Sequence, residues 1–281
     1  MNDAIISVAN LEFAFKRKKV FQGLNVTFAQ GESVVIAGRN GAGKSTLLRC
    51  LAGVYLPDRG EVRLAAGLER RRIGYISDSL SLFEDWPLER AIAFHVRTFG
   101  AAAFDDRLLK NLGLSGRERI RQLSAGERVI FHLSLILSQQ PELLLIDEIL
   151  HLIDPYIREL FIDALIESMA SRPVTVLMVN HTFNDIERIP ERIMIMDGGG
   201  FILDESAETL PQKVKKIVFR GDVPAGLPCL FVRESGHIRE CFVYPFGKGL
   251  SRRFSGQFQD IGLAEIIKAF IGGAYAQKRV D

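Results

Sequence analysis

The sequence has few cysteines, little net charge and no long apolar run, and each shortage excludes a class of protein. Its three cysteines, Cys50, Cys229 and Cys241, fit no zinc-ligand spacing and are odd in number, so we expect reduced, mostly packed thiols of a cytosolic protein. The formal net charge of +2 gives no reason to expect a nucleic-acid partner. Apolar stretches such as 129–137 are too short to cross a bilayer, and the N-terminus, which carries Asp3, lacks the features of a signal peptide.

The composition is that of a soluble globular protein, with 47% apolar and 25% charged residues. Buried parallel strands are predicted by continuous apolar runs at 33–37, 143–146, 174–179 and 193–196. Further strands are expected within 5–36 and 61–76, and helices over about 87–140. Strands that alternate with helices predict an α/β fold with a mostly parallel sheet.

The composition changes after about residue 205. Prolines interrupt short strand-like runs, and the chain ends in a helical apolar stripe of Leu263, Ile266, Ile267, Phe270 and Ile271. We therefore predict a main domain over 1–205 and a small α+β appendage, an accessory domain, over 206–281.

The stretch from Gly38 to Thr46 fits the P-loop pattern, between an apolar run and a helical segment. Glycines let the backbone turn tightly and aim N–H groups at phosphates, and the helix N-terminus adds partial positive charge. Lys44 would reach the β- and γ-phosphates, and the Ser45 hydroxyl would bind Mg²⁺. The alternative is a glycine-rich turn without a ligand. The predicted phosphate-binding residues are Gly38, Asn40, Gly41, Ala42, Gly43, Lys44, Ser45 and Thr46.

Two acids follow the apolar run at 143–146. Asp147, at the end of a central strand beside a P-loop, would hold Mg²⁺, which is the Walker B role. Glu148 would sit where water attacks the γ-phosphate, as general base or water-orienting group. The alternative is a pair of acids that only cap a strand in solvent.

Further segments complete an order of motifs. Leu123-Ser124-Ala125-Gly126-Glu127 lies between the P-loop and Asp147, and His181 follows the run at 174–179. Over roughly 5–205 the chain resembles the ATPase subunits of ABC transporters, and its last helix resembles the ending of exporter-type members. The resemblance implies a P-loop NTPase of ABC type, with an antiparallel β subdomain and a helical subdomain over about 87–140. It also implies ATP and Mg²⁺ as cofactors.

The resemblance also implies roles for single residues. Ser124 and Gly126 would bind the γ-phosphate of ATP held by a second protomer, and Asp154 would stand in the D-loop. His181 would contact the γ-phosphate and act with Glu148 and Lys44 in catalysis, although a histidine after a strand is often structural. Phe15 would stack on adenine, with a core position as the alternative.

The chain departs from the family's pattern at several positions, among them Arg39, where proline is common, and Glu127, where the signature has glutamine. Asp78 stands where the family has the Q-loop glutamine; it would still ligate Mg²⁺ or else simply face solvent. Ala125 replaces a glycine, which is tolerable only if its φ is negative. The D-loop segment is unusually apolar, so Leu150 and Ile153 are expected at a dimer interface.

The leading hypothesis is the ATP-hydrolysing subunit of an exporter-type ABC transporter. It would work as a dimer, of two copies or with a paralogue, at the inner face of the cell membrane beside a separate membrane permease. Phe83 and Trp86, after the Q-loop place, would help to dock the permease or else pack in the core. The alternatives are a soluble ABC ATPase in assembly or repair and an ATP-sensing regulatory module. The last helix would stabilise the dimer, regulate it, or serve as a packing lid.

Overall fold

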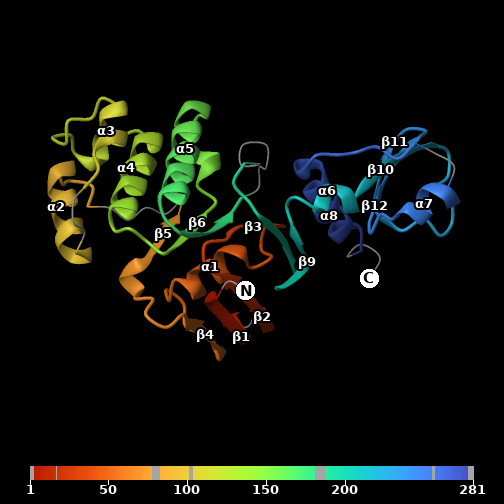
Figure 1. The fold of residues 1–281 in the computed structure, drawn as a ribbon, viewed down its shortest axis with the longest axis horizontal. Helices are drawn as coiled ribbons and strands as arrows, with labels where there is room; N and C mark the ends of the chain where they lie inside the picture. Colours follow the sequence, from red (N-terminus) through yellow and green to blue (C-terminus); the bar gives the residue numbers. More distant parts are fainter. Residues whose placement is uncertain are drawn as a thin grey trace.

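The computed structural model describes residues 3–16, 18–77, 83–100, 104–180, 188–254 and 257–277. Helices α2 to α5 gather at one end of the molecule and the C-terminal strands with α7 at the other, with the largest sheet between them (Figure 1). The expected α/β fold is confirmed.

The largest sheet has six strands in the order β5-β6-β7-β3-β8-β9. Neighbouring strands from β5 to β8 are parallel, and β9 is antiparallel to β8. The strands are β3 (Ser33–Gly38), β5 (Ile73–Ser77), β6 (Leu143–Asp147), β7 (Thr175–Val179), β8 (Arg192–Asp197) and β9 (Gly200–Ser206). All four predicted parallel strands are present.

Strand β6 shows why its residues are apolar without alternation. Leu144 and Ile146 belong to an apolar core on one face of the sheet, and Leu143 and Leu145 to a core on the other. All of these residues are fully buried, because side chains of a strand alternate between faces and both faces of this sheet are covered.

One face is covered mainly by helices, and the other by α1 and an antiparallel sheet of order β2-β1-β4. Within the described ranges, no helix is long and apolar enough to span a membrane. The elements are α1 (Lys44–Leu51), β1 (Ala4–Phe15), β2 (Lys18–Ala29), β4 (Arg59–Leu64), α2 (Leu88–Phe99), α3 (Arg107–Asn111), α4 (Ala125–Ser138) and α5 (Pro155–Ser171). The antiparallel and helical segments expected from the sequence are thus both present.

The C-terminal part forms a third sheet, of order β10-β12-β11, and several helices. Its last helix is not separate from the main core: Ile266, Ile267 and Phe270 are buried in the same apolar cluster as Ile193 of β8. The division at residue 205 stays a prediction. The elements are α6 (Leu210–Lys213), β10 (Lys215–Arg220), β11 (Cys229–Ser235), β12 (Ile238–Val243), α7 (Lys248–Arg253) and α8 (Leu263–Gln277).

The cysteine prediction was wrong for two of the three residues. Cys229 and Cys241 form a disulfide, with Cα atoms 5.9 Å apart, whereas Cys50 is a buried free thiol. The hairpin of β11 and β12 brings Cys229 and Cys241 close enough to bond. Their spacing in the sequence matches no zinc-ligand pattern and did not reveal this pairing.

Reduction of this disulfide should destabilise the C-terminal sheet. Closing a loop of this size contributes about 3 kcal/mol in the chain-entropy model. We expect dithiothreitol to increase tryptic cleavage between β10 and β12, as followed by mass spectrometry. A Cys229→Ser variant should show the same cleavage without reductant, whereas a Cys50→Ser variant should respond to reductant like the wild type. Equal cleavage with and without reductant would contradict a stabilising role.

Candidate nucleotide-binding site

The predicted P-loop residues, Asp147 and Glu148 meet where the parallel strands end. Strand β3 ends at Gly38, and Ser77, Asp147 and Val179 lie side by side at the ends of β5, β6 and β7. Carboxyl ends of parallel strands lie at one edge of a sheet, which is where open α/β sheets bind ligands. Asp78 follows β5 directly and His181 follows β7 after one residue, but both lie outside the described residues.

The P-loop backbone requires glycine at two points. At Gly38 the φ angle is 147°, and a Cβ atom would lie 2.1 Å from the carbonyl oxygen of Met196. At Gly43 the φ angle is 109°, and a Cβ atom would lie 2.8 Å from the Phe21 ring. Larger residues are therefore excluded from the loop by the neighbouring strands.

The Lys44 side chain lies over this loop and is almost fully buried. Its Nζ donates to the carbonyl oxygens of Gly38 and Arg39, both at 3.0 Å, and lies 3.5 Å from Glu148 Oε1. Burial lowers the pKa of Lys44, while the nearby carboxylates of Glu148 and Asp147 oppose that shift. The ammonium group is thus fixed inside the loop, in a position to meet an anion.

Asp147 accepts one hydrogen bond on each carboxylate oxygen. The Ser45 hydroxyl donates to Oδ1 at 2.8 Å, and the Tyr75 hydroxyl donates to Oδ2 at 3.1 Å. Burial raises the pKa of Asp147, and both hydrogen bonds counteract this. Hydroxyl and carboxylate oxygens are the ligands that Mg²⁺ prefers, together with water and phosphate, so the residues present fit that ion.

Glu148 has an unusual backbone for a residue with a side chain. Its φ angle is 50°, and its N–H donates to the carbonyl oxygen of Val179 at 3.0 Å. Non-glycine residues in this region are uncommon and concentrate at functional sites. The turn leaves the carboxylate partly exposed beside Lys44.

About three quarters of this chain is similar to known proteins. A model of the ABC transporter family matches residues 21–151. The aliphatic sulfonates import ATP-binding protein SsuB 1 of Nocardia farcinica is 34% identical over 74% of this chain and 83% of its own length. The Nod factor export ATP-binding protein I of Paraburkholderia xenovorans is 30% identical over 75% of this chain and 73% of its own length. The chain belongs to the ATP-binding subunits of ABC transporters.

Its fold is also that of a solved ABC subunit. A structure described as an ATP-binding subunit of an ABC transporter superposes with a TM-score of 0.66, at 23% identity, over 74% of this chain and 92% of that one. As a member of this family, the chain is an ABC ATPase, an enzyme that hydrolyses ATP.

The predicted signature segment begins helix α4. Ser124 Oγ accepts from the N–H of Glu127 at 3.2 Å, and the Glu127 carboxylate accepts from the N–H of Ser124 at 2.7 Å. This reciprocal capping box is a local reason for glutamate at position 127. The φ angle of Ala125 is not positive, so its methyl group meets the condition under which alanine can replace glycine there. A Cβ atom at Gly126 would lie 3.0 Å from Ile157 of α5, so small size matters there.

The D-loop segment differs from expectation. Leu150 and Ile153 are buried in the protomer's own core, so the prediction that they lie at a dimer interface was wrong. A one-turn helix at Leu150–Leu152 turns these apolar side chains inward. Asp154 Oδ1 caps helix α5 by accepting from the N–H of Ile157 at 3.1 Å. The hydrogen bonds of Ser124 and Asp154 thus stay within their own helix starts and do not join the P-loop.

Phe15 ends strand β1 and is 44% exposed, which contradicts a core position. Its ring meets Phe13 and Tyr55 edge-on, at 5.0 and 5.5 Å between centroids. An exposed ring held by two others offers a face for stacking.

Sequence reasoning missed Tyr75, Arg49 and Tyr55, which connect Asp147 to that aromatic group. Arg49 Nε donates to the Tyr75 hydroxyl at 3.3 Å, and Arg49 Nη1 donates to the Tyr55 hydroxyl at 3.4 Å. Burial and the Asp147 carboxylate raise the pKa of Tyr75 to about 12. One signal was available: Arg49 follows Ser45 by one helical turn, and so shares its face of α1.

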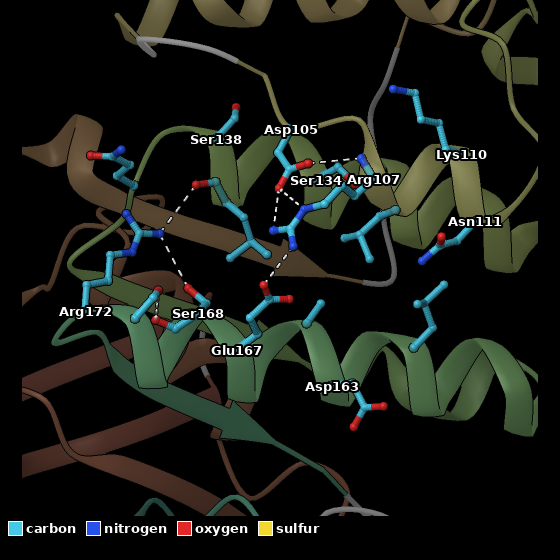
Figure 2. Close-up of a pocket in the computed structure, with 16 residues that line it drawn as sticks. Asp105, Arg107, Lys110, Asn111, Ser134, Ser138, Asp163, Glu167, Ser168 and Arg172 are labelled. Atoms are coloured by element: carbon cyan, nitrogen blue, oxygen red, sulfur yellow. Dashed lines mark hydrogen bonds and ion pairs between the residues drawn. The ribbon is translucent and has the colours of Figure 1, made fainter.

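A hollow of about 860 Å³ lies between α3, α4 and α5, away from the predicted site residues (Figure 2). Arg107 ion-pairs there with Asp105 at 2.7 Å and with Glu167 at 2.9 Å, so that it joins α3 to α5. These exposed pairs link the helical segment to the rest of the chain and leave this arginine no free charge for a ligand.

Proposed function

We propose that this ABC ATPase drives a separate membrane permease through ATP-dependent dimerisation. The observation that carries the proposal is the meeting of the P-loop, Asp147 and Glu148 at one edge of the sheet, with Lys44 between the loop and Glu148. Lys44 and the loop suit phosphate, Asp147 suits Mg²⁺, and Glu148 suits an attacking water.

In this proposal, Lys44 and the loop N–H groups bind the β- and γ-phosphates of ATP. Ser45 and Asp147 would hold Mg²⁺, which when bound would neutralise charge on the phosphates. Glu148 orients the water and accepts its proton. His181 would assist at the γ-phosphate, and Asp78 would approach the metal; both roles remain predictions.

The dimer would form two composite sites. Ser124 and Gly126 begin a long helix, whose N-terminal N–H groups favour an anion, and would close over the γ-phosphate bound to the partner. Asp154 would lie near the same interface, and the exposed face of Phe15 would take the adenine. Hydrolysis removes the shared γ-phosphate contact and lets the dimer open.

The transport direction is not part of the proposal. The expectation of export came from the last helix alone, and among the relatives found, names for import outnumber names for export. The soluble assembly factor and the ATP sensor are kept as outcomes of the test below.

The test is to purify tagged Glu148→Gln chain from mildly solubilised membranes of its own cell. A polytopic membrane protein recovered in stoichiometric amount would support the proposal and identify the permease. Recovery of a soluble partner, or of the chain alone, would contradict it. The wild-type chain serves as the control, because ATP turnover should let its complex open.

Phe83 and Trp86, just before helix α2, and Phe94 on α2 lie against one another and would form a surface for the permease. Phe83 is 55% and Phe94 48% exposed, and the Phe83 ring stacks on Trp86 at 4.1 Å. Replacing Phe83 and Phe94 with Ser should weaken capture of the permease roughly thirtyfold, the usual loss at an interface hot spot of about 2 kcal/mol. Ile202→Ser, which changes an exposed apolar residue of β9, is the matched control. Unchanged capture by the double variant would exclude this surface.

A further inference from the structure

Tyr75, on the edge strand β5, is bound on two sides. Its hydroxyl donates to Asp147 Oδ2 at 3.1 Å and accepts from Arg49 Nε at 3.3 Å. A phenol has a single hydrogen to donate and a guanidinium has only donors. Since Arg49 takes the acceptor side of the oxygen, the hydrogen must be directed at Asp147. The phenol therefore holds the carboxylate in one orientation, with Ser45 on its other oxygen.

Arg49 is itself fixed from both ends. It lies one helical turn after Ser45 on α1, so both side chains face β5 and β6. Its other branch donates to the Tyr55 hydroxyl at 3.4 Å, and Tyr55 stacks on Phe13 with centroids 5.3 Å apart. Tyr55 also meets the exposed Phe15 ring edge-on. A continuous series of contacts thus runs from the Asp147 carboxylate to the exposed aromatic ring.

We propose that Tyr75 is a positioning residue for the Mg²⁺ that accompanies the nucleotide. Arg49 connects Tyr75 to Tyr55, which contacts Phe15, the aromatic residue proposed to bind adenine. Tyr75 touches neither substrate nor metal in this proposal; it acts through Asp147. Hydrogen-bond partners of metal-binding carboxylates set their orientation, and their loss typically reduces metal affinity 10- to 100-fold. The inference rests on the proposed nucleotide site. It states that Tyr75 and Arg49, which lie outside the P-loop, influence the Mg²⁺ affinity of that site.

The test compares AMP-PNP binding by calorimetry in EDTA and in Mg²⁺. For Tyr75→Phe, we expect the AMP-PNP affinity in EDTA to equal that of the wild type. Adding Mg²⁺ should raise the AMP-PNP affinity of the variant by a factor roughly tenfold smaller than the factor for the wild type. The KM for Mg²⁺ in the ATPase assay should rise in parallel. Tyr244→Phe is the matched control, because it also removes a phenol that bonds a carboxylate, that of Glu205 at 3.4 Å, in the C-terminal part.

A second variant keeps the test decisive if Tyr75→Phe fails to fold. Arg49→Lys keeps the charge but cannot hold both phenols in the same geometry, so it should shift the Mg²⁺ dependence in the same direction. If the wild type binds AMP-PNP with Mg²⁺ and the variants gain as much from Mg²⁺ as it does, the inference is overturned. If the wild type binds no nucleotide at all, the proposed function fails instead.

Discussion

Replacement of Glu148 by Gln should abolish ATP turnover, keep ATP binding and trap a dimer. The amide preserves shape but cannot accept the proton of the attacking water, and loss of a general base typically costs 10²- to 10⁴-fold in rate. ATP should then stay between two chains. We expect phosphate release to fall by about a thousandfold, and size-exclusion chromatography with ATP and Mg²⁺ to show the doubled mass.

Glu142→Gln is the control for this prediction. Glu142 precedes β6, so the same chemical change is made at the opposite end of the same strand from the site. That variant should hydrolyse ATP like the wild type and form no trapped dimer. Wild-type turnover by Glu148→Gln would refute the role of Glu148 as base.

Replacement of Lys44 by Met should reduce ATP affinity by about two orders of magnitude. The variant lacks the ammonium and its contacts with two phosphates; hydrogen bonds to charged groups contribute about 1.5–3 kcal/mol each, and the lower figure for two bonds gives this loss. Burial lowers the pKa of Lys44, which means that its positive charge is unfavourable in the folded protein without nucleotide. The variant should therefore unfold within about 4 °C of the wild type without nucleotide. Fluorescent nucleotide titration and thermal unfolding measure both.

The control is Lys268→Met on α8, where the side chain is exposed. It removes the same charge far along the chain from the P-loop and should leave ATP affinity unchanged. Should Lys44→Met bind ATP as tightly as the wild type, the P-loop assignment itself would be wrong. A large drop in stability would instead show that Lys44 mainly supports the loop.

The sheet could be predicted from the sequence because its signal is local. The apolar run at 143–146 needs cover on both faces, and the structure gives one core to Leu144 and the other to Leu145. The P-loop residues likewise form a continuous segment between a strand and a helix. In such a segment, residues that are neighbours in the sequence are also neighbours in the site, so the sequence alone predicts the site.

The parts that were missed depend on contacts between distant residues. Tyr75 and Asp147 are neighbours only because β5 pairs with β6. The disulfide exists only because β11 and β12 form a hairpin. Leu150 and Ile153 were assigned to an interface from their apolarity alone, which does not say whether the partner surface is in the same chain. Tertiary packing decides each of these cases.

The position of α8 has a consequence for how the C-terminal part can act. Ile266 and Phe270 fill the same apolar core as Ile193 of β8, the strand beside the one that delivers the P-loop. The C-terminal part therefore cannot swing away like a hinged module without opening that core. A signal received there would have to reach the nucleotide through the packing of this shared core against the sheet, and not through the movement of a separate domain.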